Sequence, residues 1–269
     1  MLCVIRRQAG GSHLFAGIHT ASSMKCWKTA YIGYRMGGKA MGMAWVQVVL
    51  LAWGLWMARR RAASGEDDLI LPLSVRVLLS LSLVAAAFAI WRSDAASPYS
   101  EWVFWGMLMS FLGDLSMAGV IPWRQRLIGG MLTFAIAQSF YMAAFIQMMA
   151  ASGGAAGGRG LWIGVAGYGL LLVVGWMFFI RNPRKQAILN YGALGYGLWV
   201  GGMACFALDL AVKLGGVWWL TAVGGLVFVL SDLLIGVTDV GGHRIQHKEL
   251  WIWLTYVAGQ MAIIYAAAG

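Results

Sequence analysis

The chain has 269 residues, of which 61% are hydrophobic and only 11% are charged. A water-soluble domain carries about a quarter charged residues, so this composition excludes an ordinary soluble protein. The net charge of +10 does not indicate nucleic-acid binding, because the basic residues lie in short connections between apolar runs. Such residues set membrane topology and contact lipid headgroups.

The first 42 residues differ from the rest of the chain. They are basic and weakly apolar, and they contain no clear membrane span. They also lack the compact apolar core and small-residue cleavage site of a signal peptide. We expect residues 1–42 to form a basic N-terminal tail that is disordered, or translation to begin at Met41 or Met43.

Residues 43–269 are predicted to form a single membrane domain. Apolar runs of about 20 residues recur along this segment, and each is long enough to cross about 30 Å of hydrocarbon as a helix. The predicted fold class is therefore all-α, a polytopic transmembrane helical bundle of about eight spans. The expected spans are 43–58, 69–91, 102–121, 127–150, 161–180, 189–211, 217–238 and 250–268.

The distribution of Lys and Arg predicts the orientation of the bundle. The odd-numbered connections hold ten of these residues, and the even-numbered ones hold Arg92, Arg159 and Lys213. The positive-inside rule then places the odd-numbered connections in the cytoplasm and both termini on the far side. The six basic residues within 1–42 run against this orientation. We expect a multi-pass protein of a bacterial cytoplasmic membrane.

Three aspartates fall within the expected spans, at Asp114, Asp209 and Asp232. An ionisable side chain in hydrocarbon is costly and is by default a candidate for a functional site. Asp209 lies about two residues from the end of its span and is interpreted as interfacial. Asp114 and Asp232 each lie about six residues before the cytoplasmic end of spans that run in the same direction. They should therefore share one depth.

Two carboxylates that meet in a low-dielectric pocket can hold one proton between them. One carboxyl group can then act as a general acid while the other stays anionic. This arrangement can protonate a bond and stabilise the cation that results. The alternative is structural, with each aspartate capping a neighbouring helix or pairing with a buried arginine.

Other polar side chains at similar depths are candidates for substrate binding. Arg76 could bind a lipid phosphate or hold one aspartate ionised, or its long side chain could extend to the interface. Ser110 lies four residues before Asp114 and so shares its helix face. Gln138 and Gln260 lie near the membrane midplane, where side-chain amides often only bridge helices.

No metal or cofactor is expected. His243 and His247 have the i,i+4 spacing of a metal pair, but they lack a third ligand and fall in an exposed connection. Cys3, Cys26 and Cys205 are scattered and form neither a metal motif nor a disulfide framework. Gly197 and Gly201 are spaced for close helix packing and need no further role.

Several short motifs occur in a fixed order along the spans. They are Leu-Pro-Leu-Ser at 71–74, Phe-Leu-Gly-Asp-Leu at 111–115, the stretch from Gly130 to Phe145 with Tyr141, Gly-Gly-Leu-Val-Phe-Val-Leu-Ser-Asp at 224–232, and Tyr256 with Gln260. Through these motifs the sequence resembles the lysoplasmalogenase (YhhN-like) family over about residues 69–268.

The resemblance implies hydrolysis of the vinyl-ether bond of lysoplasmalogens, which releases a fatty aldehyde and a glycerophospho-alcohol. It implies that Asp114 and Asp232 are catalytic, and it adds Tyr141, Ser231 and Tyr256 to the candidate substrate-binding residues. The expected partners are a lysophospholipid substrate and membrane lipids, without nucleic acid; the oligomeric state is not predicted. The sequence departs from the family at Leu71, where Lys is common, and at Gln138, where His is common.

A vinyl ether hydrolyses by protonation at carbon, and water captures the oxocarbenium ion that forms. The chemistry resembles that of a glycosidase carboxyl pair. The sequence leaves open which aspartate donates the proton. Two other functions compete with hydrolysis. Paired carboxylates also serve proton-coupled transporters, although no expected span is interrupted by Pro. The departures from the family pattern at Leu71 and Gln138 would also be consistent with a protein that binds lipid without hydrolysing it.

Overall fold

In a computed structural model, which describes residues 19–63, 69–93 and 97–268 and their side chains from residue 41 onward, the chain is all-helical and contains no strand. The helical elements are α1 (His19–Ala63), α2 (Leu73–Trp91), α3 (Pro98–Met117), α4 (Arg126–Ala151), α5 (Arg159–Gly175), η1 (Trp176–Ile180), α6 (Ala187–Leu214), η2 (Gly216–Trp218), α7 (Trp219–Ile235), η3 (Gly236–Val240), α8 (Lys248–Tyr265) and η4 (Ala266–Ala268).

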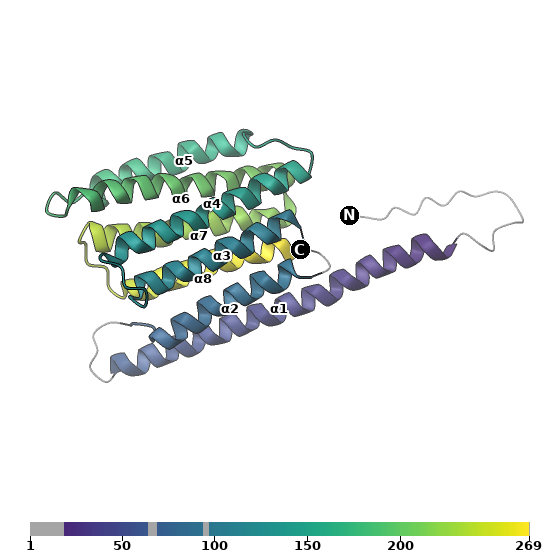
Figure 1. Cartoon of the computed structure of the whole chain (residues 1–269), viewed down its shortest axis with the longest axis horizontal. Coiled ribbons are helices and arrows are strands. Elements are labelled where there is room, and N and C mark those ends of the chain that lie inside the picture. Colours follow the sequence, from purple (N-terminus) through teal and green to yellow (C-terminus); the bar gives the residue numbers. More distant parts are fainter. Residues whose placement is uncertain (1–18, 64–68, 94–96, 269) are drawn as a thin grey trace, which may run out of the picture.

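The α-helices run alternately up and down in a flattened bundle (Figure 1). α1 and α2 form one edge and α5 and α6 form the other, while α3, α4, α7 and α8 lie between them. The C-terminal ends of α3 and α7 lie at the same end of the bundle as the N-terminal ends of α2 and α8. This end carries the odd-numbered connections, and the functional residues are arranged close to it.

Seven of the helices in the described residues are long and apolar enough to cross a membrane. α3 is not among the seven because its polar residues, which include Ser100, Glu101, Ser110 and Asp114, lower its mean hydropathy. It packs between α2 and α4 and also contacts α8, so Ser100 and Ser110 are buried, whereas Glu101 in its first turn is exposed. The chain is therefore a polytopic transmembrane helical bundle, as its composition predicted.

The first helix begins earlier than the sequence predicted. α1 starts at His19, whereas the first span was expected from residue 43 and the preceding residues as a disordered tail. Residues 1–18 of that expected tail lie outside the described part of the chain. With 45 residues, α1 is about 68 Å long, well beyond the ~30 Å of a hydrocarbon core. Figure 1 shows its N-terminal half extending past the ends of the other helices.

Glycine allows the closest helix contacts near the site. A Cβ atom on Gly113 would lie 2.8 Å from the Phe134 ring, so this glycine lets α4 approach α3 directly beside Asp114. A Cβ atom on Gly241 would lie 2.1 Å from the carbonyl oxygen of Phe179. Gly241 follows η3, and Phe179 lies in η1, so the close contact locks together the π-helical ends of α5 and α7.

Candidate active site

A polar cavity of about 170 Å³ lies between α2, α3, α7 and α8, near the end of the bundle that carries the odd-numbered connections. Asp114 and Asp232, which the sequence placed at one depth on parallel helices, both line this cavity. Its lining consists of Arg76, Asp114, Met117, Ala118, Phe134, Ser231, Asp232, Ile235, Asp239, Glu249, Ile252, Trp253 and Tyr256.

Asp114 lies in the last turn of α3 and is held from two sides. Its Oδ2 accepts a short hydrogen bond from the Ser80 hydroxyl of α2 and a second one, 2.9 Å long, from the Tyr256 hydroxyl of α8. The Arg76 guanidinium lies close enough to interact electrostatically with the same carboxylate. Hydroxyl donors and a nearby cation both favour the anionic form of a carboxyl group.

Asp232 lies in the last turn of α7 and receives fewer hydrogen bonds. Its Oδ2 accepts a hydrogen bond of 2.8 Å from the Tyr196 hydroxyl of α6. The neighbouring Ser231 lines the polar cavity, and its hydroxyl donates to the carbonyl oxygen of Ile252 in α8. Asp232 also lies within electrostatic range of Asp114. The two carboxylates thus come from parallel helices and have different hydrogen-bond environments.

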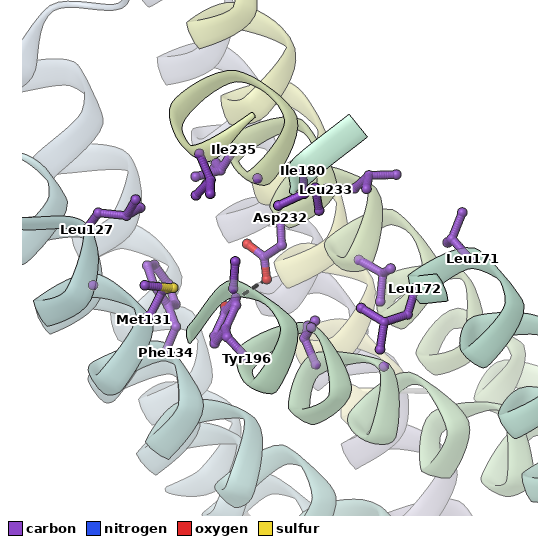
Figure 2. A pocket seen from close by; sticks show the side chains of 18 of the residues that line it. Leu127, Met131, Phe134, Leu171, Leu172, Ile180, Tyr196, Asp232, Leu233 and Ile235 are labelled. Atoms are coloured by element: carbon purple, nitrogen blue, oxygen red, sulfur yellow. Dashed lines mark hydrogen bonds between the residues drawn. The ribbon is translucent and has the colours of Figure 1, made fainter. Parts of the chain in front are cut away.

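A second cavity, of about 80 Å³, lies between α4, α5, α6 and α7. Asp232 lines both cavities, together with Met117, Phe134 and Ile235. Figure 2 shows the Asp232 carboxylate directed toward Tyr196, with Met131, Phe134 and aliphatic side chains around it. The only polar side-chain groups in this lining belong to Tyr168, Tyr196 and Asp232. Asp232 therefore marks the boundary between a polar cavity and an apolar one.

Arg76 lies in the first turn of α2 and lines the polar cavity. Its guanidinium carbon is 5.9 Å from the centre of the Trp253 ring. The Nε atom is buried and has no hydrogen-bond partner in the described residues. Buried polar groups are nearly always paired, and a guanidinium is well suited to a phosphate oxygen. The sequence left three roles open for Arg76: binding a phosphate, holding an aspartate ionised, or extending to the interface. This geometry favours a role in binding an anion within the cavity.

Three of the candidate substrate-binding residues, Ser110, Tyr141 and Gln260, form a closed hydrogen-bonded triangle. The Tyr141 hydroxyl donates to Gln260 Oε1 at 2.8 Å, and Gln260 Nε2 donates to Ser110 Oγ at 3.1 Å. The third side joins the Ser110 and Tyr141 hydroxyls at 3.2 Å. All three residues are fully buried, and none lines either cavity. The triangle lies one helical turn from Asp114 and Tyr256 and supports their positions.

The two departures from the family pattern lie outside both cavities. Leu71 is fully buried and lies close to Gly54 of α1, so it packs in the core. Gln138 is also fully buried, and neither atom of its amide group makes a hydrogen bond to the described residues. The amide interacts with the Tyr196 hydroxyl, although not with the geometry of a hydrogen bond. Substrate contact by Gln138 stays a prediction.

The structure adds four residues that the sequence reading passed over: Ser80, Tyr196, Asp239 and Glu249. Ser80 lies four residues after Arg76, so the i,i+4 rule would have placed both on one face of α2. Tyr196 lies mid-span on α6, where a hydroxyl needs a partner. Asp239 and Glu249 line the cavity from the ends of η3 and α8, just beyond the expected spans. Asp239 pairs with Lys248 at 2.6 Å.

Asp209 lies near the end of α6, as expected, and its carboxylate is held by the connection before α5. The residue is fully buried, and its Oδ2 accepts hydrogen bonds from the backbone N–H groups of Gly157 and Gly158. Oδ1 accepts from the N–H of Leu161, and Lys213 forms an ion pair of 2.8 Å with Oδ2. Asp209 therefore caps the N-terminal end of α5, and its interfacial position stays a prediction.

The last connection also has a structural contact. His247 Nδ1 accepts a hydrogen bond of 3.3 Å from the backbone N–H of Leu69, which joins the connection before α8 to the start of the α2 segment. His243 packs near the ring of Phe179. Within the described residues, no group of three or more His, Cys, Asp or Glu side chains is arranged to hold a metal ion.

The helical bundle and its internal carboxylates define a multi-pass integral membrane protein with a polar site inside its transmembrane region. Within that class the chain belongs to the YhhN family, whose model matches residues 70–267. The matched segment contains every residue of the two cavities. Neither a curated protein nor a solved structure matches the chain.

Proposed function

We propose that this protein is an intramembrane hydrolase that cleaves the vinyl-ether bond of lysoplasmalogens or of a closely related lysolipid. Family membership supports a hydrolase of this type. The observation that carries the proposal is the position of Asp232, which lines a polar cavity together with Asp114 and also lines an apolar one. A lysolipid has a polar head and an aliphatic chain, and the vinyl ether lies where they join.

The polar cavity supplies groups suited to the head of such a lipid. Arg76 offers a buried N–H that lacks a partner among the described residues, and a phosphate oxygen would satisfy it. With the phosphate at Arg76 and the chain beyond Phe134, the vinyl ether lies between Asp114 and Asp232. The bond to be broken is thereby held next to both carboxyl groups in a site screened from bulk water.

The hydrogen bonds of the two carboxyl groups assign their roles in this proposal. We assign the anionic role to Asp114, because it accepts two hydroxyl hydrogen bonds and lies near Arg76. Asp232 accepts one and carries the proton. Asp232 gives this proton to the second carbon of the alkenyl chain, and the C=C electron pair forms the new C–H bond. The first carbon becomes an oxocarbenium centre, which the Asp114 carboxylate stabilises.

Water then attacks the oxocarbenium carbon and loses a proton to the carboxylates, which restores the shared proton. The resulting hemiacetal breaks its bond to the glycerol oxygen and releases a fatty aldehyde. One water molecule is consumed, and the second product is a glycerophospho-alcohol. No oxidant, metal ion or organic cofactor is needed to balance these steps.

Product analysis on the purified protein tests the proposal. We expect aldehyde to appear when an alkenyl lysolipid is supplied and to be absent with an alkyl lysolipid of the same length. Lipid that binds but remains intact would instead establish a lipid-binding protein. Proton-driven flux into liposomes without aldehyde would establish a transporter. Either of the last two results would overturn the hydrolase proposal.

Replacing Arg76 should weaken substrate binding more than it slows turnover. Arg76→Ala removes the group assigned to the phosphate, so we expect KM to rise about tenfold to a hundredfold with a smaller change in kcat. Arg76→Lys should recover part of the loss, since it keeps the charge but not the planar fork. Steady-state kinetics of aldehyde release measure both constants.

Arg92→Ala is the matched control, because Arg92 follows the opposite end of α2 and lies far from the cavity. It should leave KM and kcat unchanged. A fall in kcat without a rise in KM for Arg76→Ala would contradict phosphate binding and would show that Arg76 acts on Asp114.

A further inference from the structure

The apolar cavity has one polar corner and otherwise apolar walls. Tyr196 and Asp232 form that corner and are hydrogen-bonded to each other. From there the lining follows α6 through Gly197 and Val200 to Gly201, and it follows η1 and α5 from Ile180 to Tyr168. At 1.5 Å per residue, the path along α6 from Ala193 to Gly201 covers about 12 Å. The cavity is therefore elongated along the helices.

We propose that this cavity is the binding site for the aliphatic chain of the lysolipid, and that Gly201 sets how far the chain can reach. The inference rests on the proposed function, since it takes the bond next to Asp232 as the starting point of the chain. Each methylene that enters exchanges fluid lipid hydrocarbon for packed apolar side chains and gains dispersion contacts with them. A volume of about 80 Å³ is enough for several such groups.

The occupant is inferred from the residues that the two cavities share. Asp232, Phe134, Met117 and Ile235 line both of them, so a molecule whose reactive bond lies at Asp232 extends into each. The portion on the apolar side meets aliphatic side chains, glycines and aromatic faces. Beyond the corner, the only polar side-chain atom in the lining is the Tyr168 hydroxyl. A linear hydrocarbon chain fits this lining, whereas a headgroup or a free sugar would lose its hydrogen bonds there.

Gly201 lies at the far end of the path, facing Tyr168. A Cβ atom at this position would have its nearest neighbour, Tyr168 Cβ, at 3.7 Å, which is ordinary van der Waals contact. A larger side chain can therefore enter the cavity from α6 without displacing backbone. Gly197, nearer Asp232, has less space, since a Cβ there would lie 2.5 Å from Leu172 Cδ1. Gly197 meets the prediction of close packing, whereas Gly201 leaves room in the cavity.

Gly201→Leu should shift chain-length preference. We expect the ratio of kcat/KM for a hexadecenyl lysolipid to that for an octenyl lysolipid to fall about tenfold, because the leucine excludes the distal methylenes. Gly195→Leu is the matched control: Gly195 lies on the same helix, is exposed, and has nothing within 4 Å of its Cβ position. It should leave the ratio unchanged. An unchanged ratio in folded Gly201→Leu would overturn the assignment of Gly201.

Photo-cross-linking tests the site without requiring turnover. The probe is an alkyl-ether lysolipid, which lacks the cleavable double bond and carries a diazirine near the end of its chain. We expect mass spectrometry to locate adducts on Leu171, Leu172 and Val200, and an excess of unlabelled alkyl lysolipid to compete them away. Adducts confined to the lipid-facing Leu198 and Trp199 would overturn the proposed site.

The two experiments separate failure of this inference from failure of the proposed function. Cavity adducts without aldehyde release from any alkenyl lipid would keep the chain site and reject the hydrolase. Aldehyde release without cavity adducts would keep the hydrolase and reject the chain site.

Discussion

Asp114→Asn and Asp232→Asn should each reduce the rate of aldehyde release from an alkenyl lysolipid by about a hundredfold to ten-thousandfold, while the bundle stays folded. A positioned general acid contributes about that factor, and loss of the anion removes the stabilisation of the oxocarbenium ion. Asparagine keeps the size and hydrogen-bonding capacity of the side chain, so Ser80, Tyr256 and Tyr196 retain partners. Initial rates and thermal unfolding of the purified variants provide the measurement.

Glu101→Gln is the matched control on α3. Glu101 lies in the first turn of that helix, is exposed, and is far from the end where the cavity lies. It should leave the rate unchanged. Full activity in either aspartate variant would contradict the assignment of a carboxyl pair. Loss in one variant alone would show that a single carboxyl group performs the chemistry.

Asp209→Ala should have the opposite profile, with a large effect on stability and little on catalysis. The substitution leaves the backbone N–H groups of Gly157, Gly158 and Leu161 without their acceptor and leaves Lys213 without its partner. Loss of a helix cap and a buried ion-pair partner together should cost about 3 kcal/mol of unfolding free energy. Thermal unfolding in detergent should show a lower Tm, while the rate per folded molecule is maintained.

Lys213→Met separates the two contributions at Asp209. It removes the ion-pair partner but keeps the capping hydrogen bonds, and Lys213 is partly exposed, so the loss of stability should be clearly smaller. Equal destabilisation by Asp209→Ala and Lys213→Met would refute capping as the main role of Asp209. Loss of turnover in fully folded Asp209→Ala would place this residue in the catalytic machinery instead.

The features that the sequence predicted well are those that depend on length and depth. Runs of about 20 apolar residues predicted the spans, and successive spans must run in opposite directions. The direction of each span and the distance of each aspartate from its end then predicted that Asp114 and Asp232 lie at one level. Both arguments need only the rise per residue of an α-helix. The beginning of α1 was missed because residues 19–42 lack the sustained apolar run on which the span prediction relied.

Side-chain direction was harder to predict because these helices are apolar on most faces. Ser110, Tyr141 and Gln260 were taken as candidates for substrate binding, because no sequence pattern distinguished a residue that faces a cavity from one that bonds to a neighbouring helix. Tyr196 was missed because it carries no formal charge. Its partner lies on α7, and contacts between helices distant in sequence depend on how the bundle packs.

The positive charge beside Asp114 comes from Arg76 and not from residue 71. Leu71 precedes α2 and points into the core, whereas Arg76 lies one turn later and lines the cavity. The loss of a family lysine at position 71 therefore does not leave the polar cavity without a cation. At position 138, the buried amide keeps a polar group next to Tyr196, the residue that donates to Asp232.

Hydrolysis in D₂O tests the central claim most directly, because protonation at carbon leaves a lasting mark on the product. Purified protein is given an alkenyl lysolipid in D₂O. The aldehyde is derivatised immediately, and its mass is measured by mass spectrometry. The proposed mechanism requires one deuterium at the second carbon of the aldehyde from the unmodified protein, and formation of labelled aldehyde at least a hundredfold slower from Asp114→Asn or Asp232→Asn. Unlabelled aldehyde, or labelled aldehyde at the full rate from either variant, would contradict it.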